Sequence, residues 1–309
     1  MRKKLPPLSR EIVKTLLDTI APETTSFAIH ELPGSYSNIT NLVEAQAPDG
    51  TTARYVVRRY VTFGTYSLEQ KARREFKTYE LLYPLGAPVP EPLFLDDAGD
   101  VLDTPGIVTR YVSGQHVMSP ADPLPWAQTL AKTLADLHSI ACDTNTHPFL
   151  LDANTEALWF LYRNDAMPDL FRGYPQGPAV WQTIRDCKPA VQPVSPTLIH
   201  LDYWSGNVLW NDDRIAAVID WEEAAYGDPA IDVAYCRMDM FQGGMDEAAD
   251  AFVTAYEAHT GHPTANLGFW ELAAVARPMH APDGWISESP AKERFVHFVD
   301  QALERALRG

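Results

Sequence analysis

Residues 198–232 read LIHLDYWSGNVLWNDDRIAAVIDWEEAAYGDPAID, and this stretch decides what kind of fold the chain can have. Short apolar runs that resemble strands alternate here with polar segments, at 198–200, 208–210 and 215–219. The loop after the first run contains Ser-Gly-Asn, a sequence that favours a tight turn. Asp202 and Asn207 stand at the two ends of this loop, and Asp220 follows the last run. We therefore expect adjacent segments to bring two carboxylates and one carboxamide to one place.

These three side chains have the chemistry of a phosphoryl-transfer site. Carboxylate and carboxamide oxygens are hard ligands of the kind that Mg²⁺ takes from proteins. The spacing H-x-D-x-x-x-x-N, with a further Asp 13 residues later, is that of kinase-type phosphoryl transfer. It predicts Asp202 as the catalytic residue, which accepts the hydroxyl proton, and Asn207 and Asp220 as metal ligands. His200 ends an apolar run, and we expect it to brace the loop backbone rather than to bind metal.

The N-terminal part of the chain has the pattern of an antiparallel sheet with one main helix. Runs rich in Val, Ile, Phe and Tyr are separated by Pro-Gly-Ser and Pro-Asp-Gly, which are turn signals. The pattern predicts strands at 26–32, 41–47, 54–60, 92–96 and 106–112 and a helix at 67–83. Further along, the apolar spacing becomes helical. We therefore expect an α+β, bilobal fold, with a sheet-rich lobe over 1–112 and a larger, mainly helical lobe over 113–309.

The motifs of the opening stretch resemble those of the aminoglycoside phosphotransferase family, which includes choline kinases and has a protein-kinase-like fold. The H-G-D-x-x-x-x-N signature of that family appears here as His200-Leu201-Asp202…Asn207. Its I-D-W…G-D-P…D signature appears as Ile219-Asp220-Trp221…Gly227-Asp228-Pro229…Asp232. The resemblance covers about residues 25–300. It implies an enzyme that uses ATP or GTP with Mg²⁺ and transfers the γ-phosphate to a hydroxyl group of a small molecule.

The resemblance also implies where the nucleotide binds. The segment Gly34-Ser35-Tyr36-Ser37-Asn38 looks like the nucleotide loop of the family, so that Gly34, Ser37 and Asn38 are expected to lie over the phosphates. The connection Arg110-Tyr111-Val112 is expected to bind the base through its backbone.

The phosphate anchor departs from the usual kinase pattern. Kinase-type lobes carry a Lys on the third strand that binds phosphate and pairs with a helix Glu, whereas the matching strand here contains Arg58 and Arg59. Side chains alternate along a strand, and the parity places Arg58 on the inward face and Arg59 on the opposite one. We expect Arg58 to bind phosphate and to pair with Glu75, because a guanidinium can also bind phosphate oxygens. In the alternative, Arg58 is solvated and Glu75 pairs with its neighbours Lys71 or Arg74.

The net charge is −16, and it is unevenly distributed. Residues 1–112 carry 13 Lys+Arg and 14 Asp+Glu, whereas the remainder carries 12 basic and 27 acidic residues. Such a field disfavours nucleic acid and anionic membranes as partners and favours cations. It predicts an amine-bearing acceptor, such as an aminoglycoside, a choline-like compound or an amino sugar. In the alternative, the acidic groups lie on the outer surface and the cleft is close to neutral.

The remaining composition is that of a globular protein. Hydrophobic residues make up 46% of the chain, and no uncharged apolar stretch approaches the ~18 residues of a membrane span. The three cysteines are far apart in sequence, which indicates a reducing, cytoplasmic compartment. Two other function classes stay open: a nucleotide-binding pseudokinase with a regulatory role, and a Mg²⁺-dependent phosphohydrolase.

Overall fold

The computed structural model describes residues 4–32, 38–62, 64–280 and 289–308. The chain forms two compact units. The first comprises residues 1–114 together with 216–223, and the second comprises 115–215 together with 224–309. The expected boundary between residues 112 and 113 stays a prediction; in the structure, the segment 216–223, which lies far along the chain, packs in the first unit.

The first unit is built on a five-stranded sheet in the order β1-β2-β3-β5-β4, in which all neighbouring strands are antiparallel. Its strands are β1 (Ser26–Glu31), β2 (Ile39–Gln46), β3 (Thr52–Arg59), β4 (Pro92–Asp96) and β5 (Gly106–Arg110). The first three form the meander that the turn signals predicted. The sequence did not predict that β5 would lie between β3 and β4.

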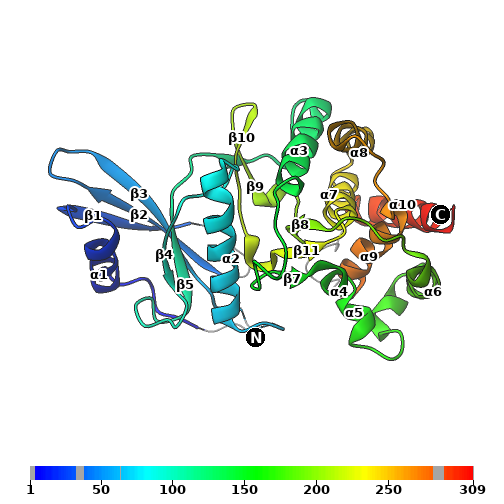
Figure 1. Ribbon diagram of the computed structural model, residues 1–309, viewed down its shortest axis with the longest axis horizontal. Helices are drawn as coiled ribbons and strands as arrows, with labels where there is room; N and C mark the ends of the chain where they lie inside the picture. Colours follow the sequence, from blue (N-terminus) through cyan, green and yellow to red (C-terminus); the bar gives the residue numbers. More distant parts are fainter. Residues whose placement is uncertain (1–3, 33–37, 63, 281–288, 309) are drawn as a thin grey trace. The chain divides into compact units, whose positions relative to one another are not determined.

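Two helices accompany this sheet, α1 (Arg10–Ile20) and α2 (Leu68–Leu82) (Figure 1). Leu16 and Leu17 of α1 pack with Val43 and Val57 of the sheet in one buried core. The burial of this apolar surface stabilises the unit. Ser67 caps the start of helix α2, because its hydroxyl accepts from the Gln70 amide while the Gln70 side chain accepts from the Ser67 amide.

The segment 216–223 joins the first unit through backbone and side-chain contacts. The Val218 amide donates to the carbonyl of Pro88 at 2.7 Å. The following single turn, Trp221–Glu223, packs against α2, and the Trp221 side chain is buried. These contacts carry Asp220 and Glu222 to the helix that holds Glu75.

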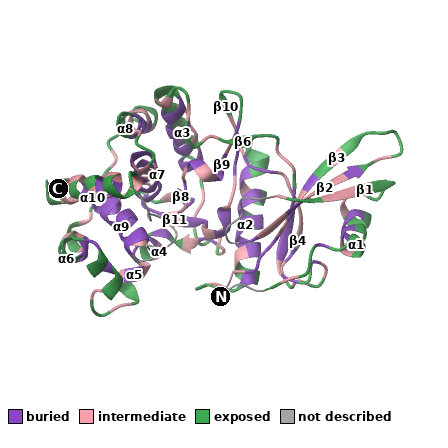
Figure 2. Cartoon of the chain, turned by 180° about the vertical axis from the view of Figure 1, so that it is seen from behind, coloured by how far each residue is buried: buried purple, intermediate pink, exposed green. Residues whose placement is uncertain are grey.

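The second unit is mainly helical. Its helices are α3 (Pro123–His138), α4 (Ala153–Ala157), α5 (Trp159–Tyr162), α6 (Gly177–Cys187), α7 (Ala230–Gln242), α8 (Asp246–Thr260), α9 (Leu267–His280) and α10 (Ala291–Arg308). Helix α7 contacts α8, α9 and α10, and nearly all of its residues are buried, as its purple ribbon in Figure 2 shows. It is the central helix of this unit.

Short strands frame the loops of the second unit. They are β6 (Gln115–His116), β7 (Leu151–Asp152), β8 (Thr197–Ile199), β9 (Val208–Asn211) and β11 (Ala225–Gly227), while β10 (Arg214–Val218) leads from the second unit into the first. Strand β11 pairs with both β7 and β8. The chain therefore has the expected α+β fold, with a sheet-rich part and a mainly helical part. Within the described ranges, no helix is both long and apolar enough to cross a membrane.

Candidate active site

The loop between β8 and β9 holds Asp202 and Asn207 against each other. The carboxamide nitrogen of Asn207 donates to the carbonyl oxygen and to Oδ2 of Asp202, both at 2.8 Å. The Asp202 amide donates to Nδ1 of His200 at 3.3 Å, which is the bracing role expected for that histidine. The structure thus brings together two of the three residues that the spacing singled out, in a loop whose own hydrogen bonds fix their orientation.

Two carboxylates of α7 fasten the same loop. Asp232 is fully buried and accepts the amides of His200 and Leu201 at 2.7 and 2.8 Å. Asp239 accepts the amide and the hydroxyl of Ser205 at 3.2 and 2.7 Å. Burial raises the pKa of Asp239 and the negative charge of Asp202 raises it further, although the bonds from Ser205 oppose the shift. A site with two neighbouring carboxylates favours a positive charge close by.

A second group of charged side chains lies in the first unit around Arg58, which β3 carries. Its Nε lies 3.3 Å from Oε2 of Glu75, so the expected pair is present. Its Nη2 also donates to Oδ1 of Asp220. The alternative partners of Glu75 bind elsewhere, since Lys71 lies 3.0 Å from Glu222 and Arg74 donates to the Glu222 carbonyl at 2.6 Å. Arg58 therefore joins the predicted helix carboxylate to the predicted metal ligand.

The electrostatics keep Arg58 charged. Burial alone would lower the pKa of the guanidinium, but the carboxylates of Asp220 and Glu75 outweigh it and hold the pKa above its usual range. Glu75 in turn accepts hydrogen bonds from the hydroxyls of Tyr60 and Tyr79. Burial and the charge of Glu75 raise the pKa of both tyrosines, so they act as neutral donors.

Glu222 connects three parts of the first unit. Its carboxylate accepts from the Asn38 side chain at 2.8 Å and from Lys71 at 3.0 Å, and it lies 3.5 Å from Arg58. Burial would raise the pKa of Glu222, but Arg58 and Lys71 lower it below the ordinary value. The last residue of the predicted nucleotide loop, the helix α2 and the strand β3 are thereby all bonded to one carboxylate.

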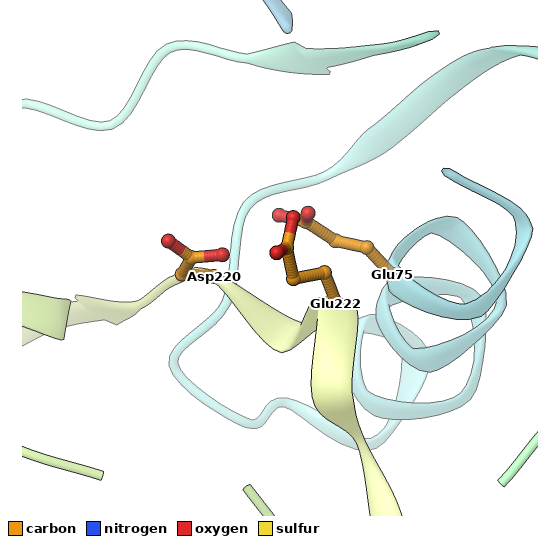
Figure 3. A group of neighbouring side chains, drawn as sticks. All are labelled: Glu75, Asp220 and Glu222. Carbon is orange, nitrogen blue, oxygen red and sulfur yellow. The ribbon is translucent and has the colours of Figure 1, made fainter. Parts of the chain in front are cut away.

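Three carboxylates point toward one another here, from Glu75, Asp220 and Glu222 (Figure 3). Each offers an oxygen within 4.8 Å of the others. Glu75 and Glu222 are engaged by tyrosines and by Lys71, whereas the Asp220 side chain is 26% exposed, more than either of them. The chemistry of the donors therefore fits Mg²⁺ best at Asp220. Asn207 also fits, because its nitrogen is committed to Asp202 and its oxygen is left as a ligand atom.

The structure describes some of the other residues predicted to bind the nucleotide, but not all of them. Gly34 and Ser37 lie outside the described residues. The Asn38 side chain is buried on Glu222. Arg110 forms an exposed ion pair with Glu91. In the connection after β5, the Tyr111 amide donates to the carbonyl of Arg54, so that this amide is occupied.

Arg59 lies in an environment that the strand pattern alone does not reveal. It is on the face opposite Arg58, as the parity predicts, and it is fully buried, with its guanidinium donating to the carbonyl of Pro6 at 3.1 Å. Burial lowers its pKa. We therefore expect substitution of Arg59 to disturb the fold.

Sequence reasoning assigned no role in the first-unit group to Tyr60, Tyr79 or Glu222, and considered Lys71 only as an alternative partner of Glu75. Glu222 stands two residues after Asp220, and this proximity was the signal available in the sequence. Lys71 and Tyr60 carry no local signal, because their partners are contacts of the folded chain.

Comparisons with known proteins identify the family of the chain. Residues 28–267 match the model of the phosphotransferase enzyme family. Acyl-CoA dehydrogenase family member 11 of Rattus norvegicus is 26% identical over 209 residues, which covers 60% of this chain and 25% of that protein. The chain thus matches about a quarter of the length of this curated relative.

Solved structures share the fold at lower identity. A choline kinase of Streptococcus pneumoniae has a TM-score of 0.61 and 17% identity, covering 97% of this chain and 99% of that one. An aminoglycoside phosphotransferase in a ternary complex with streptomycin and ATP has a TM-score of 0.58 and 16% identity, covering 96% and 97%. The family match extends over most of the chain, and the chain belongs to the phosphotransferase enzyme family.

Proposed function

We propose that this chain is a small-molecule kinase that transfers the γ-phosphate of ATP or GTP to a hydroxyl group. The observation that carries the proposal is the bonded pair of Asp202 and Asn207 in a loop of a phosphotransferase-family chain. The kinase-like solved structures, which include an ATP complex, support the nucleotide. A reducing, cytoplasmic setting is part of the proposal, and the free thiols of all three cysteines support it.

The roles follow from the chemistry of each side chain. Asp202 orients the acceptor hydroxyl and takes its proton late, because the transition state of phosphoryl transfer is loose. Asn207 and Asp220 supply oxygen ligands for Mg²⁺, which when bound neutralises charge on the phosphates. Arg58 binds phosphate oxygens and is held in place by Glu75.

The nucleotide base is assigned to the backbone after β5. The Tyr111 amide is occupied by Arg54, so the Val112 amide and the Arg110 carbonyl are the groups that we assign to the base. The phosphates are assigned to the segment that contains Gly34, Ser37 and Asn38. The bond from Asn38 to Glu222 supports this assignment, because it fastens the end of that segment to the group around Arg58.

The acceptor class that we propose is an alcohol that also carries an amine. The acidic balance after residue 112 supports a cationic partner. A choline kinase and a streptomycin-bound enzyme are among the similar structures.

The test is a panel of matched hydroxyl compounds with and without an amine, assayed with MgATP at low and moderate salt. We expect turnover with the amine-bearing members, and a kcat/KM that falls as salt screens the attraction over about 8 Å at 0.15 M. A preference for neutral acceptors, or a kcat/KM that does not depend on salt, would contradict the proposal of an amine-bearing acceptor. The proposed kinase activity would still stand. ATP binding without turnover would indicate a pseudokinase, and phosphate release at full rate without acceptor would indicate a phosphohydrolase.

A further inference from the structure

The residue immediately before Asp202 has an unusual backbone. Leu201 adopts a φ of +66°, in the left-handed region where a side chain with a Cβ is disfavoured. Its side chain is buried, with an exposed fraction of 2%. A strained residue of this kind persists only when its surroundings hold it.

Two groups hold the backbone of Leu201 from opposite directions. Its amide donates to Oδ1 of Asp232 at 2.8 Å. Its carbonyl accepts from Nη1 of Arg277 at 2.7 Å. Asp232 lies on α7 and Arg277 on α9, so two packed helices of the second unit fix one residue of the loop.

Arg277 is itself well placed to serve as a fixed donor. Its guanidinium lies over the ring of Tyr235, 4.9 Å from the ring centroid, and Tyr235 is buried on α7. The hydrogen bond of a charged donor to a carbonyl is stronger than a neutral one. Release of the Leu201 carbonyl would allow the backbone to relax from positive φ, and such a rotation would reorient the next residue, Asp202.

We propose that Arg277 is a positioning residue, which holds Leu201 in the left-handed conformation and thereby aims the Asp202 carboxylate at the acceptor hydroxyl. The effect on catalysis rests on the proposed function, because it requires Asp202 to be the proton acceptor. The structural part of the proposal, that Arg277 restrains the loop by holding Leu201 at positive φ, does not depend on the proposed function.

The test compares Arg277→Met in three backgrounds. In the otherwise unchanged chain, we expect kcat to fall about 10-fold while the KM for MgATP changes less than about 3-fold. In the Leu201→Gly background the same substitution should cost less than about 2-fold, because glycine adopts positive φ without strain. In the Leu201→Ala background the loss should return to about 10-fold, since alanine removes the buried side chain but keeps the Cβ. Equal losses in all three backgrounds, or no loss in any, would overturn the proposal.

A structural readout makes the result independent of turnover. Hydrogen exchange of the peptide 198–207 should become faster with Arg277→Met in the unchanged and Leu201→Ala chains, and should change little in the Leu201→Gly chain. The matched control is Arg294→Met, which removes another arginine that donates to a carbonyl of the second unit, that of Gln242. It should leave both kcat and this exchange unchanged.

Two remaining outcomes are also decisive. If Arg277→Met does not fold, Arg277→Lys replaces it, and its smaller loss should show the same dependence on the residue at position 201. If the unchanged chain phosphorylates no acceptor, the proposed function fails, while the exchange pattern still confirms or overturns the restraint by Arg277.

Discussion

Arg58 and Asp220 form a hydrogen-bonded ion pair, although 162 residues separate them in the sequence. The same guanidinium faces Glu75, so one partly buried cation is shared between the carboxylate of a helix and the carboxylate of a distant loop. In the proposed reaction, phosphate would balance Arg58 and Mg²⁺ would balance Asp220. The pair would thus couple the two parts of MgATP binding, because a change at one partner removes one counter-charge of the other.

The first prediction concerns Asp202. Asp202→Asn keeps the shape of the side chain but removes the proton acceptor, so we expect acceptor-dependent kcat to fall by ~10²–10⁴, the usual range for a general base. MgATP affinity should stay within a few-fold of the unchanged chain. Steady-state kinetics and equilibrium binding measure the two effects. The exposed Asp213→Asn is the control for loss of one negative charge, and near-normal turnover of the Asp202 variant would contradict the assignment.

Asp220→Asn should behave differently. Its main effect should be weaker ATP binding in the presence of Mg²⁺, because the substitution removes a charged metal ligand, while binding without Mg²⁺ changes less. Titration of nucleotide with and without the metal separates these cases. If this variant and Asp202→Asn lost the same property, the separate roles assigned to the two residues would be wrong.

The third prediction concerns Arg58. Arg58→Ala should raise the KM for ATP and lower kcat, whereas Arg58→Lys tests whether any cation suffices or a planar guanidinium is needed. The matched control is Arg54→Ala on the same strand and face, because Arg54 is half exposed and pairs with Glu44. A larger effect at Arg54 than at Arg58 would contradict the assignment of the phosphate anchor.

The fourth prediction is a pH dependence of stability. The folded chain lowers the pKa of Glu222 below 4.5, so this carboxylate stabilises the fold above that pH, and its contribution is lost as the pH falls below it. Glu222→Gln should lower the free energy of unfolding at pH 7 by about 2 kcal/mol, the scale of bonds to a charged group.

The difference in the free energy of unfolding between Glu222→Gln and the unchanged chain should then become smaller as the pH falls below 4.5. Denaturant unfolding at several pH values measures this difference. The control is Glu80→Gln, which removes the exposed partner of Lys77 on α2. It should change the free energy of unfolding little at any of these pH values. If the difference in the free energy of unfolding instead became larger in acid, Glu222 would be protonated more readily in the folded chain than in the unfolded one, which would contradict the prediction.

Much of the architecture could be predicted because it depends on local signals. Turn sequences fixed the meander, the alternation along β3 placed Arg58 and Arg59 on opposite faces, and helical spacing located α2 with Glu75. The pair of Asp202 and Asn207 followed from spacing within one loop. In each case the residues that determine the contact are few positions apart or repeat with a fixed period.

What could not be predicted depends on contacts across long separations. Glu222 binds Asn38 over 184 residues and Lys71 over 151 residues, and no periodicity connects such positions. The burial of Arg59 depends on the segment that contains Pro6. The positive φ of Leu201 is imposed by Asp232 and Arg277, against the preference of leucine itself.

The incorporation of residues 216–223 into the first unit has a consequence for the synthesis of the chain. When the first 114 residues have left the ribosome, Arg58 can pair with Glu75 but still lacks Asp220, and Lys71 still lacks Glu222. About a hundred further residues must be translated, which takes roughly 5–20 s at ordinary rates. The unit that emerges first therefore matures late, and a nascent or truncated chain would expose unpaired charge to chaperones and proteases during that interval.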